Sequence, residues 1–123
     1  MIQIKRVYEP PDIGDGKRFL VERLWPRGIK KVDLLLDGWL KDAAPSDALR
    51  HWFGHDPDKW EEFRCRYVAE LEKNSSSWKP ILDATLYGTV TLIYSAHDQA
   101  HNNALALKNF LDEQMMERSE RNS

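Results

Sequence analysis

Two arginines, Arg23 and Arg27, flank a Trp-Pro pair directly after the apolar run at residues 19–21. Pro26 has a fixed φ and drives Trp25 toward an extended conformation, so the arginines are held on a stiff turn. A guanidinium group can donate two parallel hydrogen bonds to a carboxylate or a phosphate. The segment therefore predicts a pocket for a small anion, with Trp25 as one wall. The alternative interpretation is that Arg23 pairs with a nearby acidic side chain and that Arg27 is only solvated.

Further polar side chains follow a second apolar run at residues 89–94, which is rich in β-branched residues. If both runs are parallel strands, their ends meet at one edge of the sheet, where ligands bind in α/β folds. The residues expected to bind the anion carry cationic or hydrogen-bonding side chains: Arg23, Arg27, Lys41, Ser46, Arg50, Ser95 and Asn102. Imidazole titrates near neutral pH, so His101 or His55 could move a proton there, with Asp98 as a third candidate catalytic residue.

The spacing of His97 and His101 imitates the H-E-x-x-H zinc motif, with Asp98 in place of the glutamate. Aspartate is one methylene shorter than the usual base, and no third ligand stands at a recognisable spacing. We therefore expect no metal, and nothing in the sequence calls for another cofactor. A phosphate-binding loop, a dinucleotide fingerprint and a hydrolase nucleophile elbow are also absent from the sequence.

The composition indicates one folded domain. Of the 123 residues, 41% are hydrophobic and 31% are charged, which suffices for a single core. The formal net charge of −2 gives no overall attraction to nucleic acid or acidic lipid. No segment approaches the roughly 20 apolar residues of a membrane span, and the first residues lack a signal-peptide pattern. We therefore expect a cytoplasmic protein with no membrane partner.

Periodicity and capping residues predict the elements that position these side chains. Alternation and β-branched residues predict strands at residues 2–8, 19–24 and 89–94. Helical spacing predicts helices at residues 32–40 and 46–54, two more on either side of the serines at 75–77, and a last one that starts with a capping box at 95–98. Ser46 and Asp56 are the expected N-caps of their helices, and Gly54 and Gly88 mark helix ends.

The order of these elements predicts an α/β fold, a single small domain at residues 1–116 with a short, largely parallel sheet and helices packed on its faces. Helices between the second and third strands imply that those two strands are parallel, joined by a right-handed crossover. The first two strands are separated by only about ten residues, so they are either antiparallel or parallel with a compressed connection. Residues 117–123 are polar and are expected to form a frayed tail.

Four segments carry a resemblance to a known family. They are residues 21–28 (VERLWPRG), 39–46 (WLKDAAPS), 49–56 (LRHWFGHD) and 94–104 (YSAHDQAHNNA). In this order they resemble the YeaO-like branch of a bacterial domain family of unknown function. The resemblance implies a small cytoplasmic α/β protein and no established activity. In the wider family a cysteine-containing pattern follows the last strand, whereas this chain has no cysteine there, so thiol or metal chemistry is not expected.

The leading hypothesis from the sequence is an enzyme or sensor for a small anionic metabolite, such as a nucleotide or a sugar phosphate. The alternative is a nucleic-acid accessory protein that stacks bases on Trp25 and binds phosphates through a basic patch. That patch would consist of Arg23, Arg27, Lys30, Lys31 and Arg50. A non-catalytic interaction module is a third possibility, because no catalytic set is complete. The sequence leaves open whether the protein is an enzyme and which oligomeric state it has.

Overall fold

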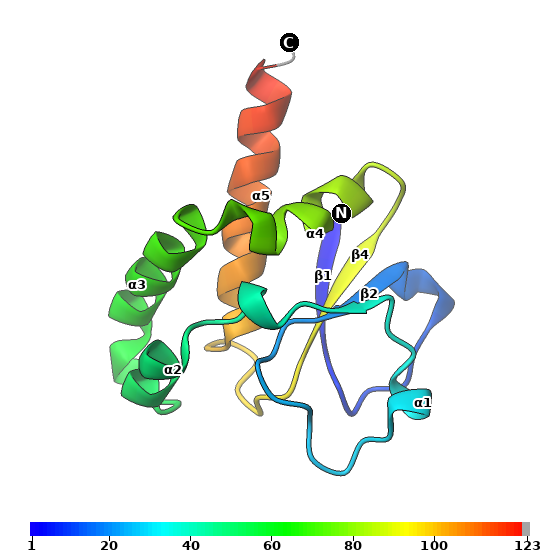
Figure 1. The fold of residues 1–123 in the computed structure, drawn as a ribbon, viewed down its shortest axis with the longest axis horizontal. Helices are drawn as coiled ribbons and strands as arrows, with labels where there is room; N and C mark the ends of the chain where they lie inside the picture. The colour runs from blue at the N-terminus through cyan, green and yellow to red at the C-terminus, as the bar shows by residue number, and fades with distance from the viewer. Residues whose placement is uncertain (122–123) are drawn as a thin grey trace.

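A four-stranded parallel β-sheet is the framework of the computed structural model, which describes residues 1–121. The strands are β1 (Ile2–Arg6), β2 (Lys17–Leu20), β3 (Gly38–Trp39) and β4 (Val90–Tyr94). Their spatial order is β1-β4-β2-β3, and every pair of neighbours is parallel (Figure 1). The α/β class and the parallel sheet predicted from the sequence are confirmed.

The middle strand β4 explains the apolar run near residue 90. All its residues are buried. It pairs along its whole length with β1 on one side and through Ile93 with β2 on the other. A parallel strand covered on both faces needs apolar side chains in both directions, which removes the alternation seen in half-exposed strands. The sequence prediction of a central strand at this position is confirmed.

β1 and β2 do not pair with each other, because β4 lies between them. Both are parallel to β4 and so to each other, which makes the antiparallel alternative wrong and confirms the parallel one with a compressed connection. The connection passes through a single 3-10 turn, Ile13–Asp15, and reaches β2 at Lys17, whose N–H donates to the carbonyl of Thr89 at 3.0 Å. β2 therefore lies two strand positions from β1, and β4 occupies the position between them.

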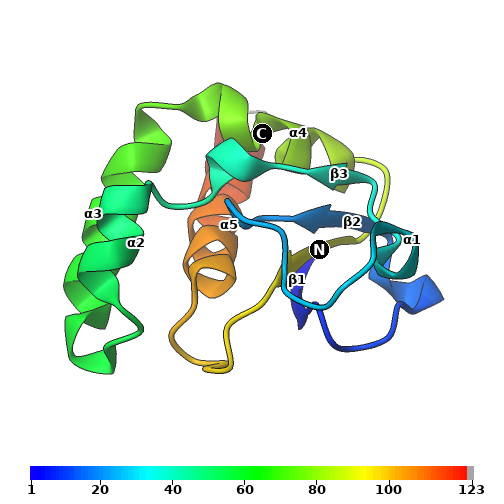
Figure 2. The same ribbon diagram turned by 60° about the horizontal axis from the view of Figure 1, so that its bottom comes forward.

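The major helices gather on one face of the sheet. They are α2 (Asp47–Phe53), α3 (Trp60–Glu72), α4 (Ser75–Thr85) and α5 (Asn103–Arg121) (Figures 1 and 2). Their buried side chains form the main core with those of Phe19, Leu92 and Tyr94 from the sheet. The other face carries a small cluster around Leu20 and Ile93, covered by the four-residue helix α1 (Lys31–Leu34) and by neighbouring loops. No helix in the described part of the chain is long and apolar enough to cross a membrane.

The predicted caps of α2 and of the segment before α3 are confirmed. The Ser46 hydroxyl accepts the N–H of Leu49 at 3.2 Å, and Gly54 ends α2 with a φ of 55°. The Asp56 carboxylate accepts the N–H of Asp58 at 3.0 Å and starts a 3-10 turn, Pro57–Lys59, which leads into α3. These caps act within four residues, so local sequence is enough to locate them.

The helix expected at residues 32–40 is wrong beyond its first turn. After α1, Leu35 adopts a left-handed conformation with a φ of 51°, and the chain turns back to the sheet. Gly38 then pairs with Phe19 as part of β3. A Cβ at Gly38 would lie 3.1 Å from the Phe19 ring, so a glycine lets the edge strand approach closely. Pairing with β2 outweighs the weak helical pattern of this segment.

The last helix starts later than the capping box at 95–98 predicts. Asp98 instead closes a loop turn, because its carboxylate accepts the N–H groups of Ala100 and His101 at 2.9 and 3.0 Å. Asn102 caps α5, since its side-chain oxygen accepts the N–H of Leu105 at 2.8 Å. At its other end α5 continues through Arg121, past the expected domain end at 116 and into the segment expected to fray. Residues 122–123 of that segment lie outside the described residues.

Candidate functional site

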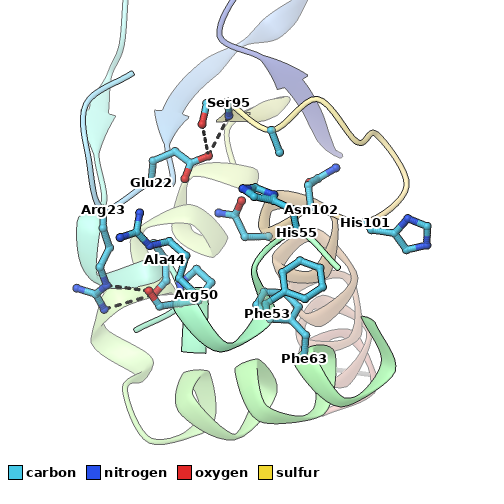
Figure 3. A pocket seen from close by; sticks show the side chains of 13 residues that line it. Glu22, Arg23, Ala44, Arg50, Phe53, His55, Phe63, Ser95, His101 and Asn102 are labelled. Atoms are coloured by element: carbon cyan, nitrogen blue, oxygen red, sulfur yellow. Dashed lines mark hydrogen bonds between the residues drawn. The ribbon is translucent and has the colours of Figure 1, made fainter. Parts of the chain in front are cut away.

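A cavity of about 110 Å³ lies where β2 and β4 end, between α2 and the start of α5. Its walls combine charged, polar and aromatic side chains from segments far apart in the sequence (Figure 3). The lining residues are Glu22, Arg23, Ala44, Pro45, Arg50, Phe53, His55, Phe63, Ser95, Ala96, His101, Asn102 and Asn103. The position is the carboxyl edge of the parallel strands, where α/β folds bind ligands.

Glu22 is the carboxylate in this cavity. Its Oε1 accepts hydrogen bonds from the Ser95 N–H at 2.9 Å and from the Ser95 hydroxyl at 3.1 Å, as the dashed lines in Figure 3 show. Burial raises the pKa of Glu22 above its usual value, while the Ser95 hydrogen bonds and the charges of Arg50 and His55 oppose part of this rise. Glu22 is thus held rigidly in a position where its ionised form is costly.

The Arg23 guanidinium is already held by hydrogen bonds and an ion pair within the protein. Its Nε donates to the Pro45 carbonyl at 2.8 Å, and its Nη2 is 3.5 Å from the Ala44 carbonyl. Its Nη1 is 3.7 Å from an oxygen of Asp42. The guanidinium therefore fastens the loop before α2 to the end of β2. It adds positive charge to the cavity wall, but most of its donors are already used.

Arg50 has a donor to spare. Its Nη2 is 3.3 Å from an Asp47 oxygen, at the exposed start of α2. Its Nε is buried and has no hydrogen-bond partner among residues 1–121. A buried donor without an acceptor is destabilising by roughly 1–3 kcal/mol, so such groups are uncommon in folded proteins. Figure 3 shows Arg50 on the same side of the cavity as Glu22 and Arg23.

The two candidate catalytic histidines differ in their surroundings. His55 follows α2 in a left-handed conformation, with a φ of 58°, and its ring lies 6.4 Å from that of Phe53. The Nδ1 of His101 is 2.9 Å from an Asp98 oxygen, and its ring meets the Trp60 ring edge-on at 5.4 Å. In Figure 3 the His101 ring points away from Glu22. His101 therefore contributes to the rim, and only His55 belongs to the electrostatic surroundings of the carboxylate.

Asp98 and the asparagines after it build the loop that closes the cavity. Hydrogen bonds from the Ala100 N–H and from His101 lower the pKa of Asp98, which is not among the lining residues. Asn102 is only 2% exposed and donates to the Asp98 carbonyl at 3.0 Å. Asn103 donates to the Val21 carbonyl at 2.7 Å and so joins the start of α5 to the end of β2. These groups position the wall more than they offer contacts to a ligand.

Besides Asp98, four of the expected site residues do not line this cavity: Trp25, Arg27, Lys41 and Ser46. The Trp25 Nε1 donates to the Ile29 carbonyl at 2.6 Å, and its ring packs edge-on against Trp39 at 5.3 Å, on the far face of the sheet. The Lys41 Nζ lies 4.1 Å above the Trp39 ring. Ser46 binds the Glu70 carboxylate, and Arg27 is exposed. The stacked rings of Phe53 and Phe63, 4.2 Å apart, form the aromatic wall instead.

Sequence reasoning missed Glu22, Phe53 and Phe63 as lining residues. A signal for Glu22 was present, because it is the first polar residue after the apolar run at 19–21. From the sequence, an acidic side chain near Arg23 is expected only as its ion-pair partner. Phe53 and Phe63 follow helical spacing and read as ordinary core. The histidine pair of the imitated zinc motif lies in the loop before α5, where the His97 Nδ1 is 3.2 Å from the Arg6 guanidinium, so the two imidazoles do not share a helical face.

Comparison with known proteins finds relatives over nearly the full chain. "Uncharacterized protein YeaO" of Escherichia coli strain K12 is 46% identical over 110 residues, which are 89% of this chain and 96% of the relative. Uncharacterised proteins of Mycobacterium tuberculosis strain H37Rv and of Mycobacterium bovis are each 38% identical over 111 residues, 90% of this chain and 93% of the relative. No solved structure gives a significant match. The 46% identity confirms the predicted resemblance to YeaO-like proteins. A family model described as "Inactive DUF488-N3 subclade" matches residues 1–123, so the chain belongs to that subclade.

Proposed function

We propose that this protein binds a small molecule with an anionic group in the cavity at the ends of β2 and β4, and that Arg50 is the main contact. The observation that carries the proposal is the buried Nε of Arg50, which has no acceptor among the described residues. A carboxylate or phosphate oxygen is the natural partner of a guanidinium N–H. Binding would remove the cost of this unsatisfied donor.

The walls favour a small ligand. A cavity of about 110 Å³ admits a compact group and not a folded partner. The stacked Phe53 and Phe63 rings offer an apolar surface beside the charged side chains. An apolar wall with a few converging polar groups is typical of small-molecule sites.

Binding without turnover is the better interpretation. The subclade is described as inactive. The most obvious proton carrier, His101, is paired with Asp98 at the rim, and its ring is turned away from Glu22 (Figure 3). A sensor or carrier of a small anionic metabolite fits these observations better than an enzyme does.

A thermal-shift screen tests the proposal. The probes are inorganic phosphate, small carboxylates, sugar phosphates and nucleotides. A ligand that binds only the folded state stabilises it by about 2.7 kcal/mol at a hundredfold excess over its Kd. We expect at least one probe to raise the Tm of the wild type and of Arg27→Gln, in which an exposed arginine outside the cavity is changed. The same probe should have no effect on Arg50→Gln.

Arg50→Lys is the second informative variant. It keeps the positive charge but loses the planar fork, so it should bind more weakly than the wild type. The proposal fails if no probe changes the Tm, or if Arg50→Gln responds as the wild type does.

A further inference from the structure

The cavity holds a negative group as well as positive ones. Glu22 lines it together with Arg23 and Arg50, and the Arg50 charge acts on the Glu22 carboxylate. Both arginines share their charge with acidic residues outside the cavity, Arg50 with Asp47 at 3.3 Å and Arg23 with Asp42 at 3.7 Å. The positive charge left for a ligand is therefore reduced, and a plain anion would also meet the Glu22 carboxylate.

The Glu22 carboxylate has capacity for a further donor. Both hydrogen bonds from Ser95 end on Oε1. Its Oε2 accepts no hydrogen bond from any residue that the structure describes. The Arg50 Nε donates no hydrogen bond to any of these residues. The residues that line the cavity thus include a free acceptor on Glu22 and a free donor on Arg50, which are oppositely charged.

We propose that the ligand is a short zwitterion, with its anionic group on the Arg50 Nε and an ammonium group on the Glu22 Oε2. This rests on the proposed function and specifies the chemical class of its ligand. An ammonium group supplies a hydrogen bond and also compensates the carboxylate charge, whereas a hydroxyl supplies only the hydrogen bond. The methylene groups between the two ends would lie against Phe53 and Phe63, which line the same cavity.

Paired compounds that differ only in the ammonium group test this proposal. The pairs are β-alanine with propionate, taurine with ethanesulfonate, and O-phosphoethanolamine with ethyl phosphate. Affinities are measured by calorimetry on the wild type, Glu22→Gln and Arg50→Gln, with Glu61→Gln as a control at a largely exposed carboxylate, 83% accessible. A gained charge-assisted hydrogen bond should favour the ammonium member of at least one pair by about tenfold or more.

The variants separate this inference from the proposed function. In Glu22→Gln the preference for the ammonium member should fall below about threefold, because the amide keeps an oxygen for Ser95 but carries no charge. In Arg50→Gln both members of the pair should lose affinity. Glu61→Gln should behave as the wild type. Glu22→Asp, which withdraws the carboxylate by one methylene, should also weaken the preference and serves if Glu22→Gln does not fold.

Each remaining outcome contradicts the zwitterion proposal alone or both proposals together. If plain anions bind as tightly as their ammonium partners and depend on Arg50, the proposed function stands and the zwitterion is wrong. The same holds if the preference survives in Glu22→Gln. If no compound binds to the wild type, or binding is indifferent to Arg50, both claims fail.

Discussion

At the scale of single residues, the cavity combines groups that are unfavourable for folding. A carboxylate in a poorly hydrated place loses solvation, and the hydrogen bonds from Ser95 restore only part of it. The buried Nε of Arg50 lacks an acceptor. Residues of this kind persist where a ligand uses them, because a binding site needs polar groups that the protein itself has not satisfied. This local imbalance is the strongest physical argument for a site here.

Glu22→Gln tests the cost of the buried carboxylate. Since the folded-state pKa of Glu22 is raised, the favourable contribution of its protonated form is present below the unfolded pKa and is lost as pH rises through the folded pKa. Glutamine avoids that loss and keeps an acceptor for Ser95. The unfolding free energy of Glu22→Gln relative to the wild type should therefore increase between about pH 4 and pH 7, a range that begins just below the ordinary glutamate pKa.

Urea unfolding at the two pH values measures this difference, and Glu61→Gln is the control. The control carboxylate is largely exposed and should show little pH-dependent change. A Glu22→Gln difference that stays constant or falls toward neutral pH would mean that burial does not dominate the titration of Glu22.

At the scale of elements, the loop that enters β2 is fixed by a close backbone contact. Gly16 has a φ of 63° and lies against the backbone of Thr89, just before β4. A Cβ at Gly16 would lie 2.0 Å from the Thr89 carbonyl oxygen. Lys17 donates to that same oxygen, so the contact sets the register of β2 against β4. The position of Glu22 at the end of β2 depends on this register.

A pair of glycine substitutions separates backbone strain from steric overlap. Gly28 also has a positive φ, 75°, but nothing lies within 4 Å of a Cβ built on it. Gly28→Ala should destabilise the protein by about 1–2 kcal/mol, the cost of a left-handed conformation with a Cβ. Gly16→Ala should cost more, about 3 kcal/mol or above, because overlap with the strand backbone adds to the strain. Chemical denaturation of both variants checks which one loses more unfolding free energy. Equal losses would mean that the Thr89 backbone moves away from the added Cβ at little cost.

At the scale of the whole molecule, the layers of the fold divide the predicted basic patch. Arg23 and Arg50 line the cavity on the helix-covered face, whereas Trp25 packs in the cluster on the opposite face. Arg27, Lys30 and Lys31 are exposed outside the cavity. The formal net charge of −2 adds no general attraction for phosphates. The nucleic-acid alternative therefore needs groups from separate parts of the molecule to act together.

Titration of a labelled single-stranded oligonucleotide at several salt concentrations tests this alternative. Five cations acting on one strand would give a slope of log affinity against log salt of about −3.5, at roughly −0.7 per phosphate. We expect no saturable binding, or a slope no steeper than about −1.4, which corresponds to two contacts. A steep slope that flattens in Arg23→Gln and in Arg27→Gln alike would instead favour the nucleic-acid function.

The sequence by itself determined the features that depend on neighbouring residues. The central strand followed from a largely apolar, β-branched run, and the caps of α2 followed from Ser46 and Gly54, because these signals act within a few positions. The parallel relation of β2 and β4 followed from the helices between them. The sequence also predicted that polar side chains gather at the ends of these strands, and Arg23, Ser95 and Asn102 line the cavity there.

Only the tertiary structure decided which groups meet there. The partner of Glu22 is Ser95, 73 residues away, and no local pattern specifies that contact. The short strand β3 exists because Gly38 fits against Phe19 at the sheet edge, which overrides the helical spacing around it. Trp25 lies on the other face because its ring packs against Trp39 there and its Nε1 donates to the Ile29 carbonyl. Pairing across the sheet and packing between layers are long-range interactions. They place Arg50 and Glu22 at the cavity and leave Trp25 and Arg27 outside it.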